Sequence, residues 1–536
     1  MAVTPFKPVT PPPAQGADDS QDPDLKVMLQ KLQRAEIDRN RHKSRISDCY
    51  KYAMPWRHQF DQNQPTDQLD EIFDSTPQRV LEDFAADMLH PFTPIKNNWL
   101  KEEAPPALDP ATKRQLAPMI AQRQQIVFAE MARSNLYQAL QESYFDLGIG
   151  TMSLLINDID PTKPIHCEAL PATDKLITRG PFGFIDGEFR KRKYLLDEIK
   201  VLWPDADVSK LTNGAAQPKD NPEYEITDGC WRDWTDRGDE TYKYLVVYAN
   251  KILYRRVWKG AGACPFITAR WLRDSTTAWG FGPQYSTLPD IKTLNHFAYL
   301  SLKNYDKHVD PPTSYEDDGV VNIDNGVQPG DWIPRATGSE PPEPIESKSK
   351  FDYEAFKIDE RTSAIKRAHY QDRPEQLGKT PPTATQWADE AAERARRMGT
   401  PATNLVMELQ IPIYRRFVYL LEQRGVLPPI RLDSGEEIAL EPISPLLRAQ
   451  EQEEVVRMDR FAELIVARFG PQMGMVAIDV IPYVKRMAEK LGIDPDMVRD
   501  ETKMAAAIEQ LAPVLQATGY LPSAAPDVAV PAGLPA

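Results

Sequence analysis

The stretch WGFGPQYSTLPDIKTLNHFAYLSLKNYDKHVDPP, residues 279–312, decides the fold of this chain. Side chains that are mostly apolar recur through it at spacings of three and four residues, which places them along one stripe of a helix. These positions are Leu288, Ile291, Asn295, Ala298, Leu302 and Tyr305. Two prolines at 311–312 end the pattern, because proline lacks an amide proton and biases the preceding residue away from helix. The stretch therefore predicts a helix whose stripe needs a neighbour.

A second helical pattern follows residues 311–350, which are rich in proline, glycine and acids. Its positions, again at spacings of four and three, are Phe351, Ala355, Ile358, Thr362 and Ile365. We expect a matched pair of helices around a compact excursion. The packing residues predicted for the pair are Leu288, Ile291, Ala298, Leu302, Phe351, Ile358 and Ile365. The residues alone leave open whether an intramolecular hairpin or a ring of subunits covers the stripes.

The composition is that of a globular protein with more than one domain. A length of 536 residues predicts two to four domains. Prolines outnumber glycines, 49 to 26, which indicates many stiff connections. No run of eighteen apolar residues occurs, so no membrane span is expected. The net charge of −15 disfavours a protein that grips nucleic acid over a broad surface, but it is compatible with a channel along which DNA slides.

The N-terminal residues show no targeting motif, and the cysteines show no metal-binding motif. Residues 1–24 have no basic stretch followed by an apolar core, so we expect a disordered N-terminal arm and no secretory signal. The four cysteines, Cys49, Cys167, Cys230 and Cys264, form no CxxC pair. That spacing argues against zinc and favours buried free thiols in a reducing compartment.

Between the arm and residue 275 the sequence changes from helical to β-rich. We predict a long helix over 25–52, a second one that starts at Ser75 or Thr76 with Pro77 in its first turn, and a third over 110–147 closed by Gly148. Residues 149–275 then show short apolar runs. The sequence YKYLVVYANKILYRRVW, residues 242–258, predicts a hairpin turned near Ala249 and Asn250.

Beyond the helical pair the chain returns to helix. Residues 385–424 show a pattern broken at Gly399, kinked at Pro412 and ended at Gly425. Residues 444–510 are helical and charged, and the last 25 or so residues, rich in alanine and proline, are expected to dangle. The fold class predicted is α+β, mainly helical.

No motif for catalysis, cofactor or metal survives inspection. Gly378-Lys379-Thr380 lacks the first glycine of a phosphate loop, whose place Arg373 takes, and Pro381-Pro382 follows. The Gly-x-Gly pairs lack a third glycine and are interpreted as turns, and the seven histidines show no ligand spacing. Acidic pairs, interpreted as solvated charge, are Glu102-Glu103, Asp317-Asp318 and Glu436-Glu437. We therefore expect no enzyme activity, no cofactor and no metal.

Four stretches of sequence carry a family resemblance. They are FDSTPQRVLEDFAADML (73–89), WGFGPQYSTLPDIKTLN (279–295), TATQWADEAAERAR (383–396) and SPLLRAQEQEE (444–454). In this order, over about residues 25 to 490, the chain resembles the podophage head-to-tail connector, or portal, family of tailed bacteriophages. The resemblance implies a wing at 25–285, stem helices at 286–310 and 351–370, a clip at 311–350 and a tunnel loop at 371–384. It further implies wing helices at 385–440, a short helical crown at 441–510 and a flexible tail at 511–536.

The resemblance also implies a function and partners. Twelve copies would form a ring at one capsid vertex, through which double-stranded DNA is packaged and ejected without sequence specificity. The ring would dock the terminase and then tail adaptor or nozzle proteins, and it would contact the major capsid and scaffolding proteins. Such a virion protein, assembled in the host bacterial cytoplasm, is not an enzyme. The alternative is another ring-forming internal virion or tail protein without a packaging role.

Candidate DNA contacts follow from the expected channel. The hypothesis is that Arg373 and Lys379, together with Lys303 and Lys307, touch phosphates transiently while the remaining wall stays acidic. Ordinary solvated charge is an equally good interpretation of each one. No base contacts are expected, because a channel must pass every sequence.

Overall fold

The structure is a computed structural model. It divides into two compact units, Met1–Ser444 and Pro445–Ala536. The residues that the structure describes are 21–57, 60, 71–95, 98–105, 108–158, 162–211, 222–236, 240–309, 313–314, 343–344, 351–371, 397–428, 438–442, 455, 458–465, 467–468, 483–484 and 487. In the second unit the described residues are helical, and the Tyr483 hydroxyl donates to Asp459 Oδ1 over 3.0 Å.

The first unit opens with two helices close to their predicted positions. Helix α1 (Pro23–Ala53) begins two residues earlier than expected, because the Asp22 carboxylate accepts from the amides of Asp24 (2.9 Å) and Leu25 (3.3 Å) and caps it. Helix α2 (Thr76–Phe92) starts as predicted after Ser75. Its cap differs, since the Asp74 carboxylate binds the Thr76 amide and hydroxyl.

The third predicted helix is wrong in one respect, because it is two helices. Helix α3 (Pro110–Arg133) and helix α4 (Leu136–Ile149) are separated at Ser134 and Asn135. The Asn135 side chain accepts from the Cys167 amide and donates to the Cys167 carbonyl, both over 2.8 Å. This pairing with strand β3 draws the backbone out of the helix. Gly148 lies inside α4, and Gly150 is the C-cap.

The predicted β-rich section contains most of the strands. One antiparallel sheet has the order β4-β5-β6-β7-β8, a second has the order β3-β2-β9, and β1 pairs with β12. The bounds are β1 Leu100–Glu103, β2 Thr151–Asn157, β3 His166–Ala169, β4 Lys175–Arg179, β5 Ile185–Leu195, β6 Glu223–Asp233, β7 Thr241–Tyr248, β8 Lys251–Lys259, β9 Phe266–Arg270 and β12 Ala439–Pro442. The predicted hairpin is confirmed as β7–β8. Ala249 and Asn250 both have positive φ, 45° and 64°, as a tight two-residue turn requires.

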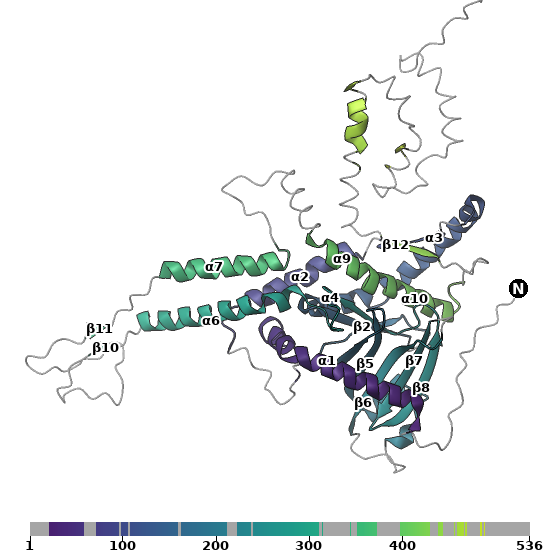
Figure 1. Cartoon of the computed structure of the whole chain (residues 1–536), viewed down its shortest axis with the longest axis horizontal. Coiled ribbons are helices and arrows are strands. Elements are labelled where there is room, and N and C mark those ends of the chain that lie inside the picture. Colours follow the sequence, from purple (N-terminus) through teal and green to yellow (C-terminus); the bar gives the residue numbers. More distant parts are fainter. Residues whose placement is uncertain are drawn as a thin grey trace, which may run out of the picture. The chain divides into compact units, whose positions relative to one another are not determined.

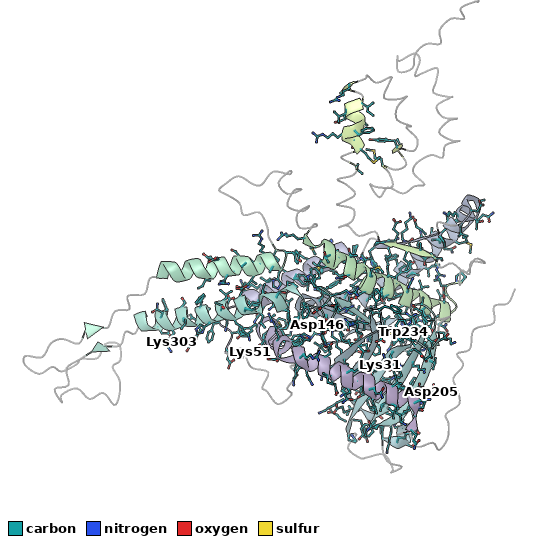
Figure 2. The ribbon with its side chains drawn as sticks, in the orientation of Figure 1. Lys31, Lys51, Asp146, Asp205, Trp234 and Lys303 are labelled. Carbon is teal, nitrogen blue, oxygen red and sulfur yellow. The ribbon has the colours of Figure 1, made fainter. Side chains whose placement is uncertain are left out.

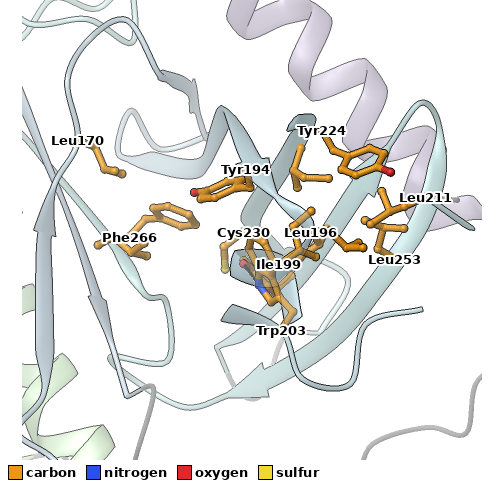
Figure 3. Close-up of a cluster of buried hydrophobic side chains, with 14 residues drawn as sticks. Leu170, Tyr194, Leu196, Ile199, Trp203, Leu211, Tyr224, Cys230, Leu253 and Phe266 are labelled. Atoms are coloured by element: carbon orange, nitrogen blue, oxygen red, sulfur yellow. Dashed lines mark hydrogen bonds between the residues drawn. The ribbon is translucent and has the colours of Figure 1, made fainter. Parts of the chain in front are cut away.

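The five-stranded sheet is covered on both faces. Leu25, Met28 and Leu32 of α1 pack against Phe189, Trp231 and other apolar side chains on one face. Figure 1 shows α1 running across this sheet. Figure 3 shows the opposite face, where helix α5 (Leu196–Leu202) and the 3₁₀ turn η3 (Val208–Lys210) cover a second apolar cluster. The sheet is thus the rigid centre of the first unit.

The predicted helical pair is confirmed as α6 (Pro283–Val309) and α7 (Phe351–Ala368). Between them, β10 (Thr313–Ser314) pairs antiparallel with β11 (Glu343–Pro344), and the rest of the expected clip lies outside the described residues. Residues 372–396, which include most of the expected tunnel loop, also lie outside the described residues. The same is true of most of the expected crown and of all of the expected tail.

In the described part of the helical region predicted over 385–424, the elements are α9 (Gly399–Leu405), the π-helical turn η4 (Val406–Gln410) and α10 (Ile411–Gln423). The predicted distortion at Pro412 takes the form of this π turn directly before it, and Gly425, with φ 71°, ends the segment as predicted. All four cysteines are free thiols, three of them buried. Within the described parts of the chain, no helix has the length and apolarity that crossing a membrane requires.

Candidate functional site

The paired helices α6 and α7 are joined at their base by a small apolar cluster. Figure 1 shows the two helices side by side. Ile291 and Leu294 of α6 meet Ile365 of α7 and Val80 of α2, and all four are at most 2% exposed. Arg361 of α7 forms an ion pair with Asp290 of α6 beside this cluster. The base is therefore held to the body by burial on three helices at once.

Asn295 fastens α6 to the segment that precedes α2. Its Oδ1 accepts from the amides of Phe73 (2.7 Å) and Asp74 (3.3 Å), and its Nδ2 donates to the Glu71 carbonyl (3.0 Å). The sequence stripe counts this residue as a packing position, but its amide group binds backbone. One polar side chain thus satisfies three backbone groups and fixes the direction in which α6 leaves the body.

His369 fastens the other helix. The ring is 1% exposed, its Nδ1 lies 2.8 Å from the Ile365 carbonyl oxygen, and its Nε2 lies 3.0 Å from the side-chain amide of Gln284 at the start of α6. Burial lowers the pKa of His369 to about 4, so the ring is neutral at pH 7. A neutral ring donates from Nδ1 and accepts at Nε2. The Gln284 amide must then present its NH₂ group to the ring, since that group otherwise has no partner.

The glycines of WGFGP form a junction between backbones. The Gly282 amide donates to the Ile149 carbonyl over 2.8 Å, and a Cβ on Gly282 would lie 2.2 Å from the Gly148 oxygen. A Cβ on Gly150 would lie 2.2 Å from the Gly280 oxygen. These glycines were interpreted as turn residues, and the structure shows that close contact between two chain segments is what requires them. The entry to α6 is consequently built against the end of α4.

The predicted packing residues divide into a buried and an exposed group. Leu288, Ile291 and Ile365 are buried, and Ile358 and Ala298 are half-buried. Leu302 was predicted to pack, but it is 52% exposed. The side chain of Phe351 lies outside the described residues.

The distal half of α6 presents an apolar surface, which we call the distal stem face. It consists of Tyr299, Leu302 and Tyr305, which are three residues apart along α6 and have exposed fractions of 38, 52 and 62%. The Tyr299 ring also contacts Phe73, with 4.9 Å between the ring centroids. Large exposed apolar patches mark interaction surfaces. In a single chain, these apolar side chains of the helical pair are therefore left partly uncovered.

The candidate DNA contacts are only partly described. Lys303 is exposed on the distal half of α6 (Figure 2), with its ammonium 5.8 Å from the centroid of the Tyr299 ring. Lys307 belongs to α6, but its side chain lies outside the description, as do both Arg373 and Lys379. Lys303 is thus the one candidate whose side chain is described, and the role of all four cations stays a prediction.

Of the three acidic pairs singled out in the sequence, the structure describes Glu102-Glu103. Glu102, interpreted as a solvated acid, is 5% exposed on β1 and accepts from Arg123 Nε over 3.2 Å; the strand pairing of β1 with β12 buries it. Asp317-Asp318 and Glu436-Glu437 lie outside the description. No group of three or more His, Cys, Asp or Glu side chains among the described residues could hold a metal ion.

A cavity of about 620 Å³ opens beside β5 and α5. Its most buried cation is Arg190, which donates from Nε to Asp228 Oδ1 and from Nη1 to Glu168 Oε2, both over 3.0 Å. The guanidinium of Arg190 is thus matched by two carboxylates.

Sequence reasoning missed the residues that hold the pair in place, namely Asn295, His369 and Gln284. One signal was present, because Asn295 is a polar residue in the middle of an otherwise largely apolar stripe. For His369 and Gln284, which are 85 positions apart, the sequence carries no comparable signal.

The sequence model of the family described as "Bacteriophage head to tail connecting protein" matches residues 25–498 of the chain. None of the curated proteins matches it significantly. Solved structures with similarity include a chain of a virion of a native gene transfer agent (GTA) particle, with 12% identity and a TM-score of 0.38 over 75% of this chain and 89% of that one. Another is from the neck of an empty GTA particle computed with C6 symmetry, with 12% identity and a TM-score of 0.38 over 80% and 93%. A third is from the neck of a native GTA particle computed with C12 symmetry, with 13% identity and a TM-score of 0.34 over 73% and 88%.

Proposed function

The chain belongs to the family of bacteriophage head-to-tail connecting proteins, and we propose that it is the portal subunit of a podovirus-like phage. In this proposal about twelve copies form a ring at one vertex of the virion capsid. Double-stranded DNA is packaged and later ejected through the ring. The ring docks first the terminase and then tail proteins, it contacts capsid and scaffolding proteins, and the chain itself catalyses no reaction.

The observation that carries the proposal is the distal stem face. The base of α6 is locked by Asn295 and by the cluster around Ile291, while Leu302 and Tyr305 remain more than half exposed. A rigidly held helix with an uncovered apolar stripe fits a site for another protein surface. A head-to-tail contact between copies covers such a face in every subunit and closes into a ring when the rotation permits.

Burial of the distal stem face would contribute a useful free energy to a contact between subunits. Covering a half-exposed Leu or Tyr contributes about 1 kcal/mol, so the three side chains of the distal stem face contribute about 3 kcal/mol to each contact between subunits. A closed ring has as many contacts as subunits. Modest apolar contacts of this size therefore stabilise a ring when they repeat around it.

The charge of the chain supports a conduit rather than a tight DNA-binding protein. A net charge of −15 per subunit disfavours long residence of DNA, which binds proteins mainly through phosphate contacts with cations. We propose that Arg373, Lys379, Lys303 and Lys307 supply brief phosphate contacts within this acidic background. Reversing the charge of Arg373 and Lys379 together should reduce the DNA packaged per particle without changing the ring. Unchanged packaging would remove both residues from the mechanism.

The first test is the native mass of the purified full-length protein, with negative-stain images of the same sample. Twelve chains of 60.8 kDa give a particle of about 730 kDa with a central hole. The double variant Leu302→Glu/Tyr305→Glu should shift the mass toward monomer. Val201→Glu, at a position that is 65% exposed on α5, is the matched control and should leave the mass unchanged.

A stable monomer of the unaltered chain across protein and salt concentrations would contradict the ring. A ring that fails to package DNA in an assembly reaction with capsid proteins and terminase would favour the alternative, a ring-forming internal virion or tail protein. Both outcomes can be told apart from misfolding, because the unfolding temperature of the chain reports on its core independently.

A further inference from the structure

A groove lined by aromatic side chains lies where strand β6 ends and its neighbours β5 and β7 begin, at one end of the three middle strands of the five-stranded sheet. Its volume is about 590 Å³, and strands β5, β6, β7 and β9 together with η4 and α10 contribute to it. We call it the aromatic groove. Its exposed apolar side chains are Phe182 (71% exposed), Phe184 (48%), Met407 (51%) and Trp234 (37%). Buried Phe266 and Ile267 also line it.

The aromatic side chains of this groove are held in place by contacts with their neighbours. Phe182 and Trp234 meet edge to face, with 5.4 Å between their centroids. The Arg232 guanidinium lies 4.3 Å from the centroid of the Trp234 ring, and Trp234 Nε1 donates to Asp186 Oδ2 over 3.1 Å. Grooves lined by aromatic rings are the surfaces to which proline-rich segments bind.

The same chain contains a segment of matching chemistry. Residues 5–13 read PFKPVTPPP, with prolines at 5, 8 and 11, three residues apart. A polyproline II helix has three residues per turn, so prolines at this spacing share one face. Pro12 and Pro13 fall off that face. The phase of the prolines, and not merely their number, is therefore suited to an aromatic groove.

The described chain begins close to the groove. Asp22 forms an ion pair with Arg255 of β8. Asp24 shares the ammonium of Lys243 with Asp233, at 2.9 and 2.7 Å, and Asp233 directly precedes Trp234 in the chain. From residue 13 to residue 22 an extended chain spans up to about 30 Å. Residues 5–11 are thus within reach of the groove of their own chain.

The charges of the proline-rich segment and of the aromatic groove are complementary. The segment carries one basic side chain, Lys7, between Pro5 and Pro8. Glu240 lies at the groove and is 34% exposed at its side chain while paired with Arg232 at 3.3 Å. A carboxylate in this position can accept a second cation from the solvent side.

We propose that residues 5–11 of the N-terminal arm bind in the aromatic groove of the same chain, with Pro5, Pro8 and Pro11 against Phe182, Trp234 and Phe184. The arm is then a strap that covers this apolar surface and ties the start of α1 to the junction of β6 and α10. This inference is independent of ring formation and of DNA packaging.

Photo-crosslinking in the full-length protein tests the strap. Phe6→p-benzoylphenylalanine places the probe beside Pro5, and mass spectrometry of the irradiated protein should find it joined to peptides that contain Phe182, Phe184 or Trp234. The triple variant Pro5→Ser/Pro8→Ser/Pro11→Ser should lower the yield at least about fivefold. Pro12→Ser/Pro13→Ser, which removes prolines from the other face, is the matched control and should leave the yield unchanged.

Mixing ¹⁵N-labelled and unlabelled protein separates the sources of the cross-link. Products within one isotope class are expected. Mixed-isotope products at the groove would overturn the assignment to the same chain and place the arm of a neighbouring copy there. Cross-links elsewhere, or a yield that the triple variant does not lower, would overturn the strap itself. All substitutions lie in the arm, before the first described residue, so we expect none of them to change the fold of the described chain.

Discussion

The contact between His369 and Gln284 makes the attachment of α7 sensitive to pH. The ring is buried and burial lowers its pKa to about 4, from an ordinary value of 6.5. The unfolded chain therefore takes up a proton at a pH where the folded chain does not. Stability is fully retained above pH 6.5, begins to fall as the pH drops below it, and stops falling on this account near pH 4. The complete loss corresponds to about 3 kcal/mol, and about 2 kcal/mol of it is lost by pH 5.

The assay compares the unaltered chain with His369→Gln by urea unfolding at constant protein concentration from pH 7.5 to pH 5. Trp271 reports on the region, because its ring lies 5.2 Å from Phe84 and 5.6 Å from Tyr370, centroid to centroid. His42, whose pKa is also lowered by burial, and the carboxylates titrate in both proteins. The difference between the two curves therefore isolates His369.

We expect the unaltered chain to lose about 2 kcal/mol relative to His369→Gln between pH 7.5 and pH 5. A difference that stays constant to within about 0.5 kcal/mol would refute the reasoning, because a buried neutral ring cannot avoid this linkage. A change of the opposite sign would show that the folded ring is charged, and that the Gln284 amide presents its oxygen instead.

Three further predictions concern stability and are measured by the same unfolding curves at pH 7.5. Gly282→Ala should destabilise the protein by about 3 kcal/mol or more, because its Cβ meets the Gly148 backbone at 2.2 Å, whereas Gly399→Ala, with nothing within 4 Å, should be neutral or slightly stabilising. Asn295→Ala should lower the free energy of unfolding by about 2 kcal/mol, and Asn295→Asp by about half of that, because the aspartate keeps both acceptor contacts and loses only the donor. Equal losses for the two variants would contradict the hydrogen bonds assigned to Asn295. Arg416→Met should cost about 3 kcal/mol or more, because the Arg416 guanidinium donates to three buried carbonyl groups, and a loss below about 1 kcal/mol would argue against that role.

Much of the fold follows from local sequence. The helical stripes placed α6 and α7, and the prolines and glycines at their ends placed most helix boundaries to within a few residues. The apolar runs on either side of Ala249 and Asn250 predicted the β7–β8 hairpin, because two such runs joined by a short turn are typical of one. Of the packing residues predicted for the site, Leu288, Ile291 and Ile365 are buried. Period, capping and turn chemistry act over a few residues, so a sequence displays them directly.

The remaining features depend on partners far away in the chain. Asn135 interrupts one predicted helix because Cys167, 32 positions later, offers both its backbone groups. Asn295 binds Glu71 across 224 positions, and Glu102 is buried because β1 pairs with β12. A polar side chain shows in the sequence that it needs hydrogen bonds, but only the folded chain decides whether water or a distant backbone group supplies them. The sequence by itself therefore determined the helices, the hairpin and the apolar stripe of α6. The tertiary structure alone decided which part of that stripe is buried at the base and which part stays exposed, because burial depends on distant segments of the chain.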